Sequence, residues 1–373
     1  MFSMFFGAGN IIFPLALGQF AQDQNVYAII GLLITAIGVP FAGLFAMTLF
    51  DGDYRDFFSR IGKLPGFFTA AIIMGLIGPF GAMPRCIALA YSTISAFLPG
   101  ISIEVFSAIS CLLVFLLTFK RNNIVDILGY FLTPILVGAL AIIIIKGLIF
   151  SPETPVAQNL QPGAAFYEGF IQGYQMMDLI GAFFFSSVVI VCLKKDMPLQ
   201  EVDNHSRIMN LTMKAIAVAA PLLALTYIGF SFLAAAHSHA LADFHSDELI
   251  SKITVLVLGK HAGLFVSIAV VLACLTTVIA LAAVFAEYLH EDITRFKLGY
   301  VPSLAITLVI TYFISTLNFT MIIALLGPVL EVCYPALITL TIANILYKLY
   351  GFKIVKTPVL IVFLLSLANA FFG

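Results

Sequence analysis

Two short polar interruptions lie inside apolar stretches of the sequence and carry most of its potential chemistry. The first, within the run FFGAGNIIFP at residues 5–14, consists of Gly7, Ala8, Gly9 and Asn10. The second is the patch GYQMMD at residues 173–178, which includes Tyr174, Met177 and Asp178. Backbone that leaves a helix exposes amide and carbonyl groups, which lipid cannot satisfy but a bound ion or substrate can. Each patch therefore indicates either a broken helix at a binding site or a close helix-packing contact made by small residues.

The two patches would offer groups of opposite polarity. Amides around residues 7–10 would bind a carboxylate, because a helix N-terminus presents free N–H groups and a partial positive charge. Carbonyl and polar groups around residues 174–178 would bind an ammonium group. Together they favour a zwitterionic amino acid that is carried with a cation.

A third stretch, ACLTT at residues 273–277, could hold that cation. The carbonyl of Ala273 and the hydroxyls of Thr276 and Thr277 are neutral oxygen ligands of the kind that coordinate Na⁺ in membrane transporters. The alternative is structural, because threonines in membrane helices commonly donate to the carbonyl one turn earlier.

Three ionisable residues lie deep in apolar segments: Arg85, Asp178 and Glu331. Charges in such places are costly, so they pair with one another or line a pathway. Arg85 could pair with Asp178 or with Glu331, or it could cap carbonyls freed by Pro84. Asp178 and Glu331 could alternatively form the acid–base pair of an intramembrane aspartyl enzyme, although no motif supports that chemistry.

The composition defines the elements that must position these residues. The chain has 373 residues, of which 62% are hydrophobic and 10% charged, whereas a soluble domain carries about 25% charged residues. We predict an all-α polytopic membrane protein embedded in a lipid bilayer. A net charge of −1 excludes a nucleic-acid surface, and neither catalytic residues nor an organic cofactor is expected.

The apolar segments number eleven, each long enough to cross a bilayer core of about 30 Å. They cover residues 1–19, 27–50, 66–98, 103–119, 124–150, 165–193, 210–236, 262–289, 300–317, 320–347 and 357–372. Residues 238–260 are predicted to form a loop with a short surface helix. Fourteen of the 18 Lys and Arg residues fall on connections that lie in the cytoplasm if the first span begins there.

The second interruption occurs five spans after the first, so the second set of spans enters the membrane in the opposite sense. Interrupted helices at matching positions of two inverted halves are typical of a transporter's central site. We therefore predict one transport domain over residues 1–373, with a first repeat at 1–150, an inverted second repeat at 165–347 and an additional helix at 357–373.

Four stretches carry a resemblance to a known family. They are FFGAGNIIFP, GPFGAMPR at residues 78–85, GYQMMD with residues 181–187, and LACLTTVIALAAVFAEY at residues 272–288. In this order they resemble the first, third, sixth and eighth helices of the branched-chain amino acid:cation symporter family, within the amino acid–polyamine–organocation superfamily. The resemblance implies the fold of sodium-coupled leucine transporters, in which two inverted five-helix repeats contain broken first and sixth helices.

The resemblance also implies a function and a cation site. Leucine, isoleucine or valine would be imported with Na⁺ or H⁺ by alternating access, through a multi-pass protein of the cell inner membrane. The same fold could instead carry another small amino acid or solute. The Na⁺ ligands would be the carbonyls of Ser3, Phe6 and Ala273 and the hydroxyls of Thr276 and Thr277.

The ends of the chain depart from the family pattern. Family members usually carry about a dozen more residues before the first break, and these form the inner half of the first helix. They also carry one more span than the eleven counted here. The resemblance therefore predicts a chain that is shortened at both ends.

Overall fold

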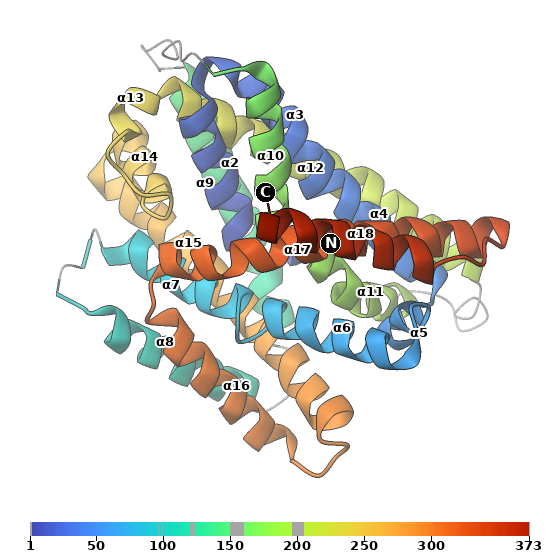
Figure 1. Cartoon of the computed structure of the whole chain (residues 1–373). Helices are drawn as coiled ribbons and strands as arrows, with labels where there is room; N and C mark the ends of the chain where they lie inside the picture. The colour runs from blue at the N-terminus through green and yellow to red at the C-terminus, as the bar shows by residue number, and fades with distance from the viewer. Residues whose placement is uncertain are drawn as a thin grey trace.

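The computed structural model describes residues 2–95, 97–98, 100–119, 124–149, 160–195 and 205–372. Within these ranges the regular secondary structure is entirely helical (Figure 1). The first half comprises α1 (Phe2–Phe5), α2 (Ala8–Ala21), a 3₁₀ turn (Gln22–Gln24), α3 (Asn25–Leu33), a π-helical turn (Ile34–Gly38), α4 (Val39–Leu49), α5 (Tyr54–Ser59), α6 (Lys63–Ile77), α7 (Ala82–Ser95), α8 (Ile103–Thr118) and α9 (Ile124–Ile149). The second half comprises α10 (Pro162–Gln175), α11 (Asp178–Lys195), α12 (His205–Ala236), α13 (Ser238–Leu241), α14 (Leu249–Leu258), α15 (Lys260–Tyr288), a π-helical turn (Leu289–Ile293), α16 (Tyr300–Ser315), α17 (Phe319–Tyr350) and α18 (Lys356–Phe372).

Among the described residues, six helical stretches are long and apolar enough to cross a membrane. They are Ala8–Leu49, Lys63–Ser95, Pro162–Ile190, His205–Ala236, Lys260–Ile293 and Phe319–Tyr350. Five shorter apolar helices accompany them: Ile103–Thr118, Val137–Ile149, Leu249–Leu258, Tyr300–Ser315 and Lys356–Phe371. The 42-residue stretch Ala8–Leu49 contains two of the predicted spans, joined by the 3₁₀ turn. The total of eleven spans stays a prediction.

The third predicted span is interrupted near its middle. Helix α6 ends at Ile77 and α7 begins at Ala82, so the chain leaves helical geometry around Gly78 and Pro79. Pro84 does not cause this break. It lies in the first turn of α7, where a missing backbone N–H costs little. The interruption places Arg85 near the start of a helix rather than in the middle of one.

The four half-helices formed by the two breaks each pack against a helix from the other half of the chain. Helix α2 packs on α12, α10 on α3, α11 on α4 and α1 on α11 and α12. At the crossing of α2 with α12, a Cβ atom at Gly18 would overlap the carbonyl oxygen of Ser231. At the crossing of α3 with α10, a Cβ atom at Gly169 would overlap the carbonyl oxygen of Ala28. Small residues at these crossings let the helix backbones touch.

The connection at residues 238–260 differs from its prediction. It contains two helices, α13 and α14, which lie together at one end of the molecule in Figure 1. Helix α14 is amphipathic: Leu249, Ile250 and Ile253 are buried against α2, α9 and α15, whereas Leu256 is 53% exposed. Its apolar side chains recur at helical spacing, and in this fold neighbouring helices cover that face.

Helix α10 offers a test of the close packing on α3. Gly169→Ala should destabilise the protein and lower its melting temperature, because backbone atoms of α3 occupy the space that the new methyl group needs. Gly163→Ala in the same helix is the matched control, since nothing lies within 4 Å of a Cβ atom there. That control should stabilise by up to about 1 kcal/mol through helix propensity. Equal melting temperatures for the two variants in detergent would contradict the packing.

Candidate functional site

The first helix break lies at Phe6 and Gly7, between α1 and α2. Gly7 is extended (φ −118°, ψ −165°), and its amide donates to Oδ1 of Asn10 at 2.8 Å. In an unbroken helix this amide would donate to the carbonyl of Ser3. The side chain of Asn10 therefore takes the place of a helical acceptor, and the Ser3 carbonyl loses its helical donor.

The second break lies at Met176 and Met177, between α10 and α11. Met177 adopts a left-handed backbone conformation (φ 66°), which is unfavourable for residues other than glycine. Its amide donates to the carbonyl of Tyr174 at 3.1 Å, and its carbonyl accepts from Gly181 at 3.0 Å. Asp178 begins α11, so its carboxylate lies at the positive end of that helix. Broken first and sixth helices, as predicted, are thus present.

A side-chain network joins the two breaks. Nδ2 of Asn10 donates to Oδ2 of Asp178 at 2.7 Å and to the hydroxyl of Tyr227 at 2.5 Å. The Tyr227 hydroxyl lies 3.4 Å from the same Asp178 oxygen. All three side chains are buried, with exposed fractions of 2%, 7% and 0% for Asn10, Asp178 and Tyr227. Residues 168 positions apart in the sequence therefore meet in one buried polar cluster.

Sequence reasoning missed Tyr227. It lies in the apolar helix α12, within LLALTYIGF, where a tyrosine is common and carries no spacing signal. A buried tyrosine hydroxyl usually needs a polar partner, and this requirement was the available clue. Only the packing of α12 on α2 identifies that partner as Asn10.

Arg85 lies beside both breaks but forms neither of the predicted ion pairs. Nη1 donates to the carbonyl of Gln175 at 2.6 Å, at the C-terminal end of α10, and the guanidinium stands 5.4 Å from the centre of the Phe13 ring. Among the described residues, no carboxylate lies within 4 Å of Arg85. Arg85 therefore caps the C-terminal end of α10. The capped carbonyl is that of Gln175 and not, as predicted, one freed by Pro84.

Glu331 is exposed on α17 and takes no part in this cluster. The predicted pairing of Arg85 with Glu331 is therefore wrong. A glutamate on a helix surrounded by apolar residues looks intramembrane in sequence, but its direction depends on how α17 packs. Because Glu331 lies away from Asp178, it cannot serve as the second carboxylate that an aspartyl enzyme would need.

Of the predicted cation ligands on α15, Thr277 lies near the first break. The hydroxyls of Thr276 and Thr277 both donate to the carbonyl of Ala273, at 2.9 and 3.0 Å, as the structural alternative predicted. Each hydroxyl oxygen keeps lone pairs that could face a cation. The methyl group of Thr277 lies 3.8 Å from the place that a Cβ atom on Gly7 would occupy, so α15 approaches the break closely. Phe6 is buried at the break, and the backbone of Ser3 lies in α1.

A cavity of about 50 Å³ lies between the two breaks. Its polar and charged lining comes from Asn10, Arg85, Asp178 and Thr277, and apolar lining comes from Phe5, Ile77, Met176, Met177, Phe185 and Leu281. Every residue of the predicted substrate site lines it except Tyr174, which stacks on Tyr334 with ring centres 4.8 Å apart. The cavity can hold water molecules, but ligand pockets measure about 300–1,000 Å³, so a bound amino acid requires the surrounding helices to move apart.

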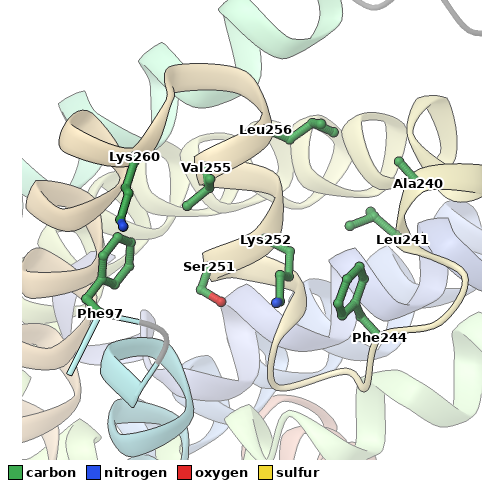
Figure 2. A pocket seen from close by; sticks show the side chains of 9 residues that line it. All are labelled: Phe97, Ala240, Leu241, Phe244, Ser251, Lys252, Val255, Leu256 and Lys260. Atoms are coloured by element: carbon green, nitrogen blue, oxygen red, sulfur yellow. The ribbon is translucent and has the colours of Figure 1, made fainter. Parts of the chain in front are cut away.

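A larger cavity of about 360 Å³ lies elsewhere (Figure 2). Its lining consists of four α14 residues, Lys260 at the start of α15, Phe97 and the side chains of Ala240, Leu241 and Phe244. Nζ of Lys252 lies 4.4 Å from the Phe244 ring centre. Neither helix break reaches it. We place the candidate site in the smaller cavity, because only there do the interrupted backbones and buried charges converge.

A polar contact joins two connections that the Lys and Arg distribution places on the cytoplasmic side. Nε of Arg55 lies 2.8 Å from Oδ1 of Asp292, and the Tyr54 hydroxyl donates to Oδ2 of Asp292 at 2.5 Å. Burial raises the pKa of Tyr54 above its ordinary value, and the hydrogen bond to Asp292 acts in the same direction. The hydrogen bond that Arg55 itself donates to Asp292 raises the pKa of Arg55. Both side chains therefore keep their protons at neutral pH, and the contact ties α5 to the end of α15.

The fold matches that of a solved structure. The chain is similar to the solved structure titled "Inward facing conformation of Mhp1", with a TM-score of 0.56 and 16% sequence identity over 93% of this chain and 75% of that one. This likeness concerns the fold alone. Together with the broken helices, it shows the fold of sodium-coupled leucine transporters.

The family follows from sequence. The family model described as branched-chain amino acid transport protein matches residues 1–372. The branched-chain amino acid permease BrnQ of Bacillus subtilis is 29% identical over 381 residues, which cover 98% of this chain and 84% of that protein. A putative branched-chain amino acid carrier protein of Staphylococcus aureus is 29% identical over 389 residues, covering 98% and 85%. The chain belongs to the branched-chain amino acid transport protein family. It is a transporter, and the aspartyl-enzyme hypothesis is wrong.

The polar cluster can be tested through Tyr227. Tyr227→Phe should lower the free energy of unfolding by about 1 kcal/mol, because Asn10 loses a buried hydrogen-bond partner. Tyr288→Phe is the matched control, since the Tyr288 hydroxyl is buried without a hydrogen bond among the described residues. Thermal unfolding in detergent, followed for both variants, measures the difference. A loss that is no larger for Tyr227→Phe than for Tyr288→Phe would mean that the cluster adds no stability.

Proposed function

We propose that this chain imports leucine, isoleucine and valine together with a cation, by alternating access, across the cell inner membrane. The observation that carries the proposal is the buried cavity at which both helix breaks, Arg85 and Asp178 converge. Membership in the branched-chain amino acid transport protein family supports the substrate class. A cavity too small for an amino acid fits a step of alternating access in which the half-helices around the site lie close together.

The proposed substrate site is formed by Gly7, Ala8, Gly9, Asn10, Tyr174, Met177 and Asp178. The first turn of α2 supplies amides to an anionic group, and Asp178 supplies a carboxylate to an ammonium group. Met177 supplies apolar surface for an aliphatic side chain. Tyr174 would act indirectly, by stacking on Tyr334 and fixing the end of α10.

The proposed Na⁺ site is formed by the carbonyls of Ser3, Phe6 and Ala273 and the hydroxyls of Thr276 and Thr277. Loss of the helical donor to the Ser3 carbonyl and the approach of Thr277 to Gly7 support it. Proton coupling is the alternative, with Asp178 as the buried group that could take up a proton.

The proposed repeats, 1–150 and 165–347, are supported by the reciprocal packing of α2 on α12 and α10 on α3.

Uptake of labelled leucine into proteoliposomes tests the function. An inward Na⁺ gradient should drive accumulation, and excess isoleucine or valine should compete with it. An inward proton gradient without Na⁺ separates the two coupling ions. If excess leucine fails to block uptake of whichever amino acid is accumulated, a same-fold symporter for another small solute becomes the better reading.

The cation site makes a separate prediction. Thr276→Ala combined with Thr277→Ala should raise the Na⁺ concentration needed for half-maximal leucine uptake by roughly tenfold or more, because two oxygen ligands are lost. Thr316→Ala, at an exposed hydroxyl beyond the end of α16, should leave that concentration unchanged. Uptake by the double variant with unaltered Na⁺ dependence would place the cation elsewhere.

A further inference from the structure

We propose that Arg85 binds the carboxylate of the amino acid substrate while Asp178 binds its ammonium group, so that the two buried charges recognise the zwitterion. This inference rests on the proposed function and extends it. It assigns Arg85 to substrate specificity, where sequence reasoning left an ion pair, a pathway charge or a helix cap. Three features of the cavity support this assignment.

The first observation is that Arg85 is buried with donors to spare. Its side chain is 3% exposed, and its Nε is buried without a hydrogen bond among the described residues. Nη1 reaches the carbonyl of Gln175, which is neutral, and no carboxylate of the described part of the chain lies within 4 Å. A guanidinium offers five N–H donors in a fork that matches a carboxylate. The buried Arg85 guanidinium therefore has a free binding position for an anion.

The second observation is the position of Arg85 at the start of α2. Nη2 lies 3.1 Å from the place that a Cβ atom on Gly9 would occupy, so the guanidinium rests against the first turn of this 14-residue helix. The free amides of that turn and the helix dipole are also positive. Both face the same cavity, because Gly7, Ala8, Gly9 and Arg85 all line it. An anion entering here would meet the backbone amides and the guanidinium together.

The third observation is the state of Asp178 at the same cavity. Its hydrogen bonds from Asn10 and Tyr227 both go to Oδ2 and come from neutral donors. Oδ1 is left without a hydrogen bond among the described residues, and no cationic side chain lies within 4 Å. The cavity thus carries one positive and one negative group that are not paired with each other. An α-amino acid zwitterion supplies the opposite charge to each.

The arrangement also accounts for selectivity between small molecules of the same shape. Leucine, leucinamide and 4-methylpentanoate share one aliphatic group and differ only in which charges they carry. The apolar walls at Met176, Met177 and Phe185 would accept all three. Only leucine would satisfy both Arg85 and Asp178, since the amide lacks the anion and the acid lacks the ammonium group.

The test uses the purified full chain in detergent and measures ligand-induced rises in melting temperature across a concentration series. Wild-type protein should bind leucine roughly 10- to 100-fold more tightly than leucinamide, the range expected for a hydrogen bond to a charged group. Arg85→Gln should reduce that ratio to within about threefold by weakening leucine alone. Arg295→Gln, at an exposed arginine outside the cavity, is the control and should keep the wild-type ratio.

A purely structural role gives a different result. If Arg85 only caps α10, Arg85→Gln lowers the melting temperature of the free protein but keeps the wild-type ratio of leucine to leucinamide, and the proposal is overturned. Should Arg85→Gln fail to fold, Arg85→Lys retains the charge but loses the fork, and it should bind leucine more weakly while binding leucinamide equally. An unchanged ratio in that variant also overturns the proposal.

Failure of the proposed function is distinguishable. A wild-type chain stabilised by another amino acid and not by leucine would refute the branched-chain substrate. The ratio would then be measured with that amino acid and its amide, and it would still decide the role of Arg85. A wild-type chain that binds amino acids and their amides equally well would overturn the assignment of Arg85, whatever the substrate.

Discussion

Backbone that leaves helical geometry inside a membrane must find polar partners within the protein, and this requirement organises the centre of the molecule. The Gly7 amide meets this requirement by donating to Oδ1 of Asn10. The same asparagine then reaches Asp178 at the second break and Tyr227 on α12. One amide side chain therefore satisfies the first break and ties it to the second, so neither break can be understood alone.

Close helix packing keeps that centre in register. Helix α2 lies on α12 and α10 lies on α3 with glycines at the crossings, so their backbones approach without intervening side chains. At a distance from the centre, Tyr54 and Arg55 on α5 hold Asp292 at the end of α15. Helix α15 also carries Thr276 and Thr277, so a polar contact at one end of this helix and the proposed cation site share one rigid element.

The Arg85 and Asp178 side chains are not paired with each other, and the proposed zwitterionic ligand would supply a partner to each. Arg85 and Asp178 line one cavity, yet Arg85 bonds a carbonyl and Asp178 bonds neutral donors. An ion pair between them would neutralise both and leave no electrostatic reason to bind a zwitterion. Keeping them apart costs stability, because buried charges prefer partners. Binding sites commonly accept such a cost, since the ligand repays it.

The sequence by itself determined the membrane class, the positions of both helix breaks and the residues inside them. These features depend on local chemistry, namely apolar length, glycine content and polar residues in apolar surroundings, and the chain expresses them without reference to its neighbours. Gly7, Asn10, Met177 and Asp178 could therefore be chosen in advance, and they line one cavity.

Only the tertiary structure decided which side chains meet. It paired Asn10 with Tyr227, turned Glu331 outward and directed Arg85 to the carbonyl of Gln175. It also decided which face of α14 is covered, with Leu249, Ile250 and Ile253 buried and Leu256 exposed. The physical reason is that an apolar membrane helix gives almost no periodic signal for which face is covered, because lipid and protein neighbours are equally apolar. Which face of a helix is buried depends on its packing against helices that are distant in the sequence. That packing exists only in the assembled fold.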